Sequence, residues 1–137
     1  MTVLPALLDT DILSAIMRQD PVVIPKAGDY LLVHEQFTFS IITRYEILRG
    51  LKAKGAAKQL VAFDRFCDVN VILPLTDEII IKASDIYALL KQRDELIGDA
   101  DILIASTALA QGLCVVTNNL SHFQRIPELQ IQNWLQP

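Results

Sequence analysis

Apolar runs and helical periodicity alternate along the whole chain, and this alternation predicts strands separated by helices. Strands of a parallel sheet are buried on both faces, so they appear as short unbroken apolar runs. Such runs occupy residues 4–8, 37–42, 69–75 and 113–117, with an edge strand expected at 129–131. Helical spacing is found over residues 10–19, 22–35, 43–55, 56–67, 76–93 and 102–110, with a short turn or helix at 121–126. We therefore predict an α/β fold, a single domain over residues 1–137 with three α/β/α layers and a central parallel sheet of four to five strands.

Local signals predict several helix boundaries. Asp20-Pro21 should end the first helix, because the residue before a proline avoids the helical conformation. Thr43 and Glu46 have the spacing of a capping box, and Gly55 should end the helix that this box begins. The long helix over residues 76–93 should bury one stripe, made of Ile79, Ile80, Ala83, Ile86, Tyr87 and Leu90.

Composition narrows the protein class. Hydrophobic residues make up 52% of the chain, which is typical of a protein with a substantial core. The start of the chain lacks the basic region of a signal peptide, and no apolar run approaches the roughly 20 residues that cross a bilayer. Cys67 and Cys114 lack the spacing of a metal or redox motif, so we expect buried thiols in a reducing cytoplasm.

The charge distribution is uneven. A formal net charge of −4 argues against a general nucleic-acid binder. Half of the twelve basic residues nevertheless lie in one short region, namely Arg44, Arg49, Lys52, Lys54, Lys58 and Arg65. This region is either a solvated helix face or a local phosphate-binding surface, and the pattern leaves both open.

Acidic and amide side chains recur where the predicted strands end. Asp9 follows the first strand, Glu46 lies in the first turn after the second, Asp101 begins the helix before the fourth, and Asn118-Asn119 follow the fourth. If the strands are parallel neighbours, these positions meet at one edge of the sheet. Carboxylates held together repel unless a hard cation neutralises them, and an all-oxygen site favours Mg²⁺ or Mn²⁺. Such a site can activate water for phosphodiester hydrolysis.

Each of these acids also has a purely structural interpretation. Asp9 could cap the first helix, and Glu46 could serve only as the capping-box partner. For Asp99, capping of the helix that begins at Ala100 is the favoured role. Asp101 lies inside an otherwise apolar helix, where an unused carboxylate is costly to desolvate, so it is the strongest candidate for a functional acid.

Four blocks of sequence together resemble a known family. They read LLDTD, SIITRYEILRG, IGDADILIASTAL and GLCVVTNNLSHFQRIP, within a match that runs from Leu7 to Trp134. In their order and spacing they are similar to the motifs of PIN-domain proteins, and more narrowly to the VapC toxins of bacterial toxin–antitoxin pairs. The resemblance implies a PIN-like α/β/α domain and a small endoribonuclease that depends on Mg²⁺ or Mn²⁺.

The resemblance also implies roles for individual residues. Asp9, Glu46 and Asp101 would be catalytic, and Asp9 and Asp101 would bind the metal. Thr117 matches the family threonine at the end of the fourth strand. Further candidate positions in the site are Thr43, Asp11, Asp99 and Asn119, and candidates for guiding the RNA backbone are Arg44, Arg49 and Lys52. Asn119 stands where the family often has an acid, which would weaken a second metal site unless Asp11 or Asp99 points inward.

The resemblance implies protein partners as well. VapC-like toxins are held inactive by a cognate antitoxin, and they commonly form homodimers. An apolar helix face around Ile47, Leu48 and Leu51 could serve either contact, and packing into the core is the equally good alternative.

Two other functions stay open at this point. A haloacid-dehalogenase-like phosphatase would use Asp9 as nucleophile and Asp11 as acid/base, but it would leave Glu46 without a role and offers only Lys91 as its lysine. A non-cleaving PIN-like module that binds RNA or a partner would explain the amide at Asn119, but not the persistence of the three acids.

Overall fold

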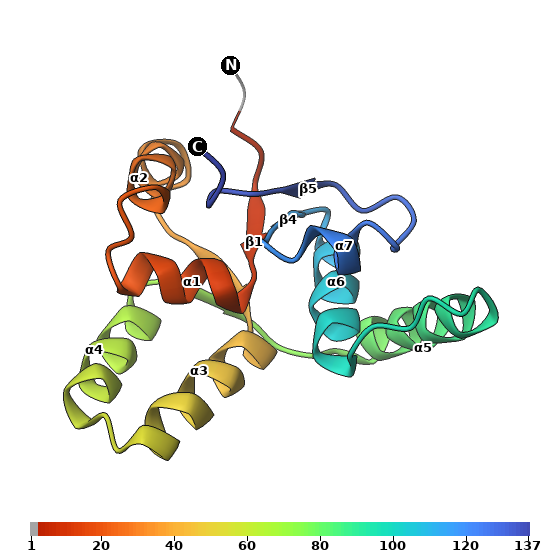
Figure 1. Cartoon of the computed structure of the whole chain (residues 1–137), viewed down its shortest axis with the longest axis horizontal. Coiled ribbons are helices and arrows are strands. Elements are labelled where there is room, and N and C mark those ends of the chain that lie inside the picture. Colours follow the sequence, from red (N-terminus) through yellow and green to blue (C-terminus); the bar gives the residue numbers. More distant parts are fainter. Residues whose placement is uncertain (1–2) are drawn as a thin grey trace.

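The computed structural model describes residues 3–137 as strands and helices in regular alternation (Figure 1). The strands are β1 (Ala6–Leu8), β2 (Thr38–Ser40), β3 (Val71–Leu73), β4 (Cys114–Val116) and β5 (Ile131–Gln132). The helices are α1 (Thr10–Met17), α2 (Val23–His34), α3 (Ile41–Lys54), α4 (Ala57–Asp68), α5 (Asp77–Gln92), α6 (Asp99–Gln111) and α7 (Leu120–Phe123). Every predicted element is present in the predicted order, and the α/β class is confirmed.

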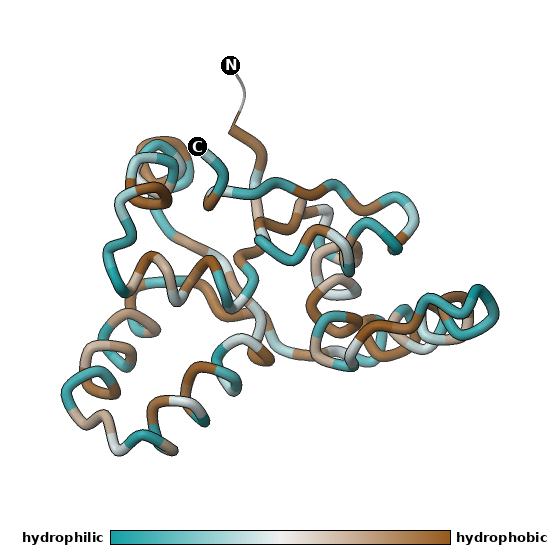
Figure 2. Tube along the Cα trace, viewed as in Figure 1, coloured by the Kyte–Doolittle hydropathy of each residue, from teal (hydrophilic) through white to brown (hydrophobic). Residues whose placement is uncertain are grey.

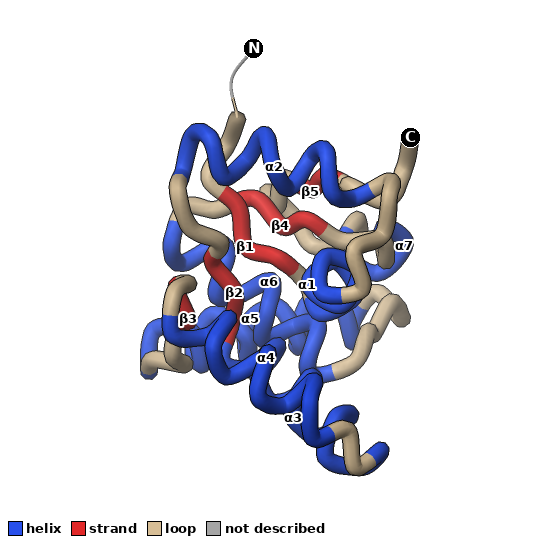
Figure 3. The backbone as a smooth tube through the Cα atoms, turned by 90° about the vertical axis from the view of Figure 1, so that its left-hand side faces the viewer, coloured by secondary structure: helices blue, strands red, loops and turns tan. Residues whose placement is uncertain are grey.

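The five strands form a parallel central layer made of two hydrogen-bonded sets. One set has the order β1-β4-β5 and the other pairs β2 with β3, and every pair is parallel. The strands β1 and β2 lie side by side where the two sets meet (Figure 3). Strand number and direction therefore agree with the prediction, whereas the hydrogen-bonded ladder is divided rather than continuous.

Alternating side chains of the central strands divide the core into two parts. Leu8 and Val116 pack with α1, α2, α3 and α4, whereas Leu7 and Val115 pack with α5, α6 and α7. The two groups of helices lie on opposite sides of the strands (Figure 1). In Figure 2, β1 and β4 are among the hydrophobic segments, whereas the chain just after the end of α5 is hydrophilic. This arrangement confirms the three α/β/α layers.

The start of α3 differs from the prediction. The helix begins at Ile41, and Ser40 is its N-cap, with a hydroxyl that accepts a hydrogen bond from the backbone N–H of Ile42 at 3.0 Å. The predicted capping box of Thr43 and Glu46 is therefore wrong, and Thr43 is fully buried inside the helix. Serine is as good an N-cap as threonine. The cap at Ser40 lets the helix include Ile41 and Ile42, although isoleucine is common in strands.

The buried stripe of α5 is narrower than predicted. Ile79, Ala83, Ile86 and Leu90 are buried, at the spacing of one helix face. The prediction was wrong for Ile80 and Tyr87, which are each 43% exposed. Both line a shallow groove between α5 and α6, with Ala83, Ser84, Asp99, Ile102 and Leu103.

The predictions for the helix-ending glycine Gly55, for Gly112 and for both cysteines are confirmed. Gly55 and Gly112 end α3 and α6 in the left-handed conformation, at φ +65° and +67°, which glycine adopts without steric cost. Cys67 and Cys114 are free and buried. Over residues 3–137, no helix is both long and apolar enough to cross a bilayer.

Replacing Tyr30 by phenylalanine should destabilise the fold. The buried Tyr30 hydroxyl accepts a hydrogen bond from the backbone N–H of Ala6 at 3.1 Å, and phenylalanine would leave that donor without a partner at the start of β1. We expect Tyr30→Phe to lower the free energy of unfolding by about 1–3 kcal/mol in chemical denaturation. Tyr45→Phe is the matched control, because Tyr45 is 57% exposed. Removing its hydroxyl should change the free energy of unfolding by less than about 0.5 kcal/mol. Equal effects of the two changes would contradict this role.

Candidate active site

Asp9 lies where β1 ends and α1 begins. It is only 5% exposed, and it is the N-cap of α1. One carboxylate oxygen accepts a hydrogen bond from the backbone N–H of Thr10 at 2.8 Å, and the other accepts one from the Thr117 hydroxyl at 2.8 Å. Asp9 therefore caps the helix, as one interpretation expected, and also joins the ends of β1 and β4.

Thr10 connects this region to α3. Its hydroxyl donates to Oε1 of Glu46 at 2.7 Å and lies 3.2 Å from the hydroxyl of Thr43. The other carboxylate oxygen of Glu46 lies 3.5 Å from the Arg49 guanidinium. Glu46 is thus oriented from two sides, and the buried Thr43 contributes to the site although it caps no helix.

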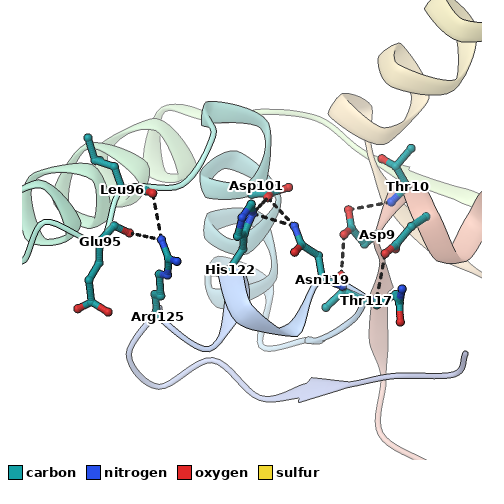
Figure 4. Close-up of polar contacts among 11 residues, drawn as sticks. Asp9, Thr10, Glu95, Leu96, Asp101, Thr117, Asn119, His122 and Arg125 are labelled. Carbon is teal, nitrogen blue, oxygen red and sulfur yellow. Dashed lines mark hydrogen bonds and ion pairs between the residues drawn. The ribbon is translucent and has the colours of Figure 1, made fainter. Parts of the chain in front are cut away.

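Asp101 forms the opposite part of the site (Figure 4). From the first turn of α6, its Oδ2 lies 2.9 Å from Nδ1 of His122 and 3.3 Å from the amide nitrogen of Asn119. The backbone N–H of Asn119 in turn donates to the Thr117 hydroxyl at 2.9 Å. The predicted acids are therefore connected through one hydrogen-bond network, which we call the site network. Its members are Asp9, Thr10, Thr43, Glu46, Asp101, Thr117, Asn119 and His122.

Asp11 lies beside the site network and acts on it through its charge. Its carboxylate accepts hydrogen bonds from the backbone N–H groups of Ile12 at 2.7 Å and Asn118 at 2.9 Å. These contacts hold the loop after β4 against the start of α1. A supporting or capping role for Asp11, rather than direct metal binding, agrees with this placement.

Asp99 lies outside the site network. It is exposed as the first residue of α6, and it lines the groove between α5 and α6. The predicted N-cap role is wrong, because the helix starts one residue earlier than expected and Gly98 occupies the cap position in an extended conformation.

Burial and like charges raise the proton affinity of the acids at the end of β1. The pKa of Asp9 is raised from 3.8 to about 7, first by burial and then by the negative charge of Asp11, with a smaller effect of Asp101. Hydrogen bonds from Thr117 and Thr10 lower it in part. Burial also raises the pKa of Asp11. A bound cation would relieve the cost of ionising these groups.

The donor atoms present suit a hydrated magnesium ion better than a closed protein cage. Over residues 3–137, no three His, Cys, Asp or Glu side chains are grouped closely enough to hold a metal by themselves. Mg²⁺ keeps several water ligands, however, and is usually held by one or two carboxylates together with substrate phosphate. Asp9 and Asp101 fit this kind of binding, and the raised pKa of Asp9 marks the negative charge that such an ion would neutralise.

Three positions that belong to the site network or support its elements were missed by the sequence analysis. Thr10 and His122 belong to the site network, and Arg125 donates to the backbone carbonyls of Glu95 and Leu96, both at 3.1 Å (Figure 4). Arg125 thereby fixes the loop that leads into α6. The signal for His122 was its position one helical turn after Asn119, whereas no local pattern indicates Thr10 or Arg125.

The basic residues of α3 differ in their surroundings. Arg49 is exposed and lies 5.1 Å from the centre of the Tyr45 ring, and Lys52 is also exposed. Arg44 is half-buried beside Cys67, where its guanidinium opposes the rise that burial causes in the thiol pKa. Arg49 and Lys52 are therefore better placed than Arg44 to meet a phosphate backbone.

The apolar face of α3 packs into the protein. Ile47 is buried, and Leu48 and Leu51 are half-buried against the core. The core-packing interpretation of this face is therefore confirmed. Ile47 and Leu51 also line one side of a groove between α1, α3 and α4.

The stability of the metal-free protein should fall as the pH rises. Between pH 3.8 and about 7 the folded state keeps a proton on Asp9 that the unfolded chain has lost. The free energy of unfolding therefore falls by up to roughly 4 kcal/mol over this pH range. The raised pKa of Asp11 changes the stability in the same direction. Chemical denaturation in the presence of a chelator, at about pH 5 and about pH 8, measures the change.

The matched variant is Asp9→Asn, which carries no charge at either pH. Its stability should depend less on pH, and it should exceed that of the wild type at the higher pH. An unchanged pH dependence in Asp9→Asn would show that other groups cause the effect.

Comparison with known proteins identifies the family of the chain. A model of the PIN domain matches residues 6–129. Ribonuclease VapC1 of Haemophilus influenzae strain R2866 is 31% identical over 130 residues, which cover 93% of this chain and 96% of that protein. The tRNA(fMet)-specific endonuclease VapC of Salmonella typhimurium is 33% identical over 96 residues, which cover 69% of this chain and 73% of that protein.

The fold is also similar to that of a solved structure. The crystal structure of VapBC2 from Rickettsia felis, bound to a DNA fragment from their promoter, matches with a TM-score of 0.84 and 27% identity. The match covers 94% of this chain and 98% of that one. With its parallel strands, its acids at the end of β1 and in the first turn of α6, and these relatives, the chain belongs to the PIN domain family and is related to the VapC ribonucleases.

Proposed function

We propose that the protein is an endoribonuclease toxin that hydrolyses RNA phosphodiester bonds in the cytoplasm, with Mg²⁺ or Mn²⁺ as its cofactor. The observation that carries this proposal is the site network, which places Asp9 and Asp101 at the adjoining ends of β1 and α6. Relatives named as a ribonuclease and as a tRNA(fMet)-specific endonuclease support the reaction, and the raised pKa of Asp9 supports the cation.

Asp9 and Asp101 would hold the cation. When bound, it would polarise the scissile phosphate and lower the pKa of a nearby water. Glu46 is held by Thr10 and Arg49 and is 21% exposed, so one carboxylate edge can accept a proton from the attacking water. These residues would contact the RNA backbone, so they would not select a base.

Arg49 and Lys52 would bind the RNA backbone beside Glu46. Both are exposed on α3, and phosphate contacts of this kind give affinity without sequence preference. Arg49 has a second role in this proposal, since its contact with Glu46 would weaken when RNA phosphate competes for the guanidinium.

The phosphatase alternative loses support at Asp11. Both oxygens of that carboxylate accept backbone N–H groups, so Asp11 is poorly placed to exchange a proton with a substrate. Glu46, which the phosphatase would not use, is a member of the site network. The non-cleaving module keeps the same fold, and the following experiment separates it from the nuclease.

Asp9→Asn and Asp101→Asn should each reduce RNA cleavage by roughly 100-fold or more, because each removes a charged metal ligand. The measurement is single-turnover cleavage of total RNA and of a tRNA pool in Mg²⁺, with circular dichroism to confirm folding. Asp85→Asn is the control, an exposed acid on α5 whose loss should leave the rate unchanged. Wild-type protein that binds RNA without cutting it would support the non-cleaving module, and full activity of either site variant would contradict the nuclease assignment.

We also propose a cognate antitoxin as partner. Solved VapBC complexes among the structural relatives support this pairing. The groove between α1, α3 and α4 has an apolar lining of Met17, Ile47 and Leu51, with Arg18 and Lys54 also lining it. These groups suit a segment that carries apolar and acidic side chains.

Self-association belongs to the same proposal. The groove between α5 and α6 exposes Ile80 and Tyr87, which a second copy of the chain could cover. Ile80→Glu should then shift the solution mass, measured by light scattering, from twice 15.3 kDa to 15.3 kDa. The matched control is Ile81→Glu, because Ile81 is 57% exposed and lies outside this groove. A monomeric wild-type protein, or a dimer that survives Ile80→Glu, would contradict this interface.

A further inference from the structure

Three polar atoms at the start of α6 and α7 form a closed triangle (Figure 4). Oδ2 of Asp101 lies 2.9 Å from Nδ1 of His122 and 3.3 Å from the terminal amide of Asn119. The third side, from the Asn119 amide to Nδ1 of His122, measures 2.8 Å. Each atom thus lies within hydrogen-bond distance of the other two.

Hydrogen bonds cannot satisfy all three sides of this triangle. An ionised Asp101 only accepts, and Nδ1 of an imidazole carries either a proton or a lone pair. If Nδ1 donates to Asp101, two donors face each other across the 2.8 Å side to Asn119. If Nδ1 accepts from Asn119 instead, its lone pair faces the carboxylate oxygen at 2.9 Å. Turning the amide of Asn119 moves the conflict to the third side without removing it.

A cation above the plane of the triangle removes the conflict. The oxygen and nitrogen of a terminal amide exchange places by rotation, so Asn119 can present its carbonyl oxygen to the triangle. All three atoms can then offer a lone pair to the same ion. Adjacent ligands of an octahedral cation with bonds of about 2.1 Å lie about 3 Å apart, which is the size of this triangle. His122 and Asp101 have side chains 39% and 20% exposed, so an ion can reach them.

We propose that Asp101, Asn119 and His122 form one face of the metal site, with Nδ1 of His122 as a direct nitrogen ligand. This inference rests on the proposed metal-dependent function. It adds His122 as a metal ligand and a preference of the site for Mn²⁺. Imidazole suits transition metals, whereas Mg²⁺ favours oxygen, so His122 shifts the preference of the site toward Mn²⁺. The nitrogen ligand also compensates for the neutral amide at Asn119, which is a weak ligand alone.

The test uses Mn²⁺ alone and needs no RNA. Electron spin echo envelope modulation of the Mn²⁺-loaded full chain detects nitrogen bound directly to the ion. We expect ¹⁴N modulation in the wild type and its loss in His122→Gln. We also expect the Kd for Mn²⁺ to rise roughly tenfold or more in that variant, with a smaller change for Mg²⁺.

The chain provides its own control, because it contains only two histidines. His34 contacts the backbone carbonyl of Val3 and packs on Tyr30, so His34→Gln should keep the nitrogen modulation. Bound Mn²⁺ without nitrogen modulation in the wild type, or modulation that persists in His122→Gln, would overturn the inference. A protein that binds no Mn²⁺ would overturn it too.

The proposed function fails by a different result. A wild-type protein that shows the nitrogen modulation but cleaves no RNA would retain the metal site and refute the endoribonuclease. Conversely, RNA cleavage in Mg²⁺ by a protein without nitrogen modulation would retain the endoribonuclease and refute the ligand role of His122.

Discussion

The hydrogen bond between Asp9 and Thr117 is the interaction on which the site depends. It joins the ends of β1 and β4, and the Thr117 hydroxyl also accepts a hydrogen bond from the backbone N–H of Asn119. Both side chains are buried, so the carboxylate is held in place where ionisation is costly. The fold thus keeps an acid in a position that stability alone would disfavour, which is typical of a residue retained for its chemistry.

The sequence predicted the order of the elements because short apolar runs and helical periodicity are local signals. It also predicted that Asp9, Glu46 and Asp101 would lie together, since parallel strands bring their carboxyl ends to one edge. It failed where two local signals competed, as at the caps Ser40 and Gly98, since helix starts depend on tertiary contacts as well as on residue type.

The contribution of His122 and Arg125 could not be predicted from strand ends. Both follow β4 and reach α6 or the loop before it, a contact between segments about twenty to thirty residues apart. Only the packing of the short α7 beside α6 brings them there. The positions of the side chains that orient the acids therefore depend on long-range packing. The positions of the acids themselves depend on the topology of the strands and helices.

The site spans the junction between the two hydrogen-bonded sets of the central layer. Asp9 and Thr117 belong to the hydrogen-bonded set that contains β1 and β4, whereas Glu46 is carried by α3, which follows β2 in the other set. Among residues 3–137 no strand ladder joins β1 to β2, so the contact of Thr10 with Glu46 is one of the few polar links between the halves. Ile47 of α3 and Phe63 of α4 nevertheless lie in the same buried cluster as Leu8 and Ile12, so apolar packing takes the place of a strand ladder at this junction. The separation of Asp9 and Glu46 is therefore fixed by the volume of the side chains packed beneath them.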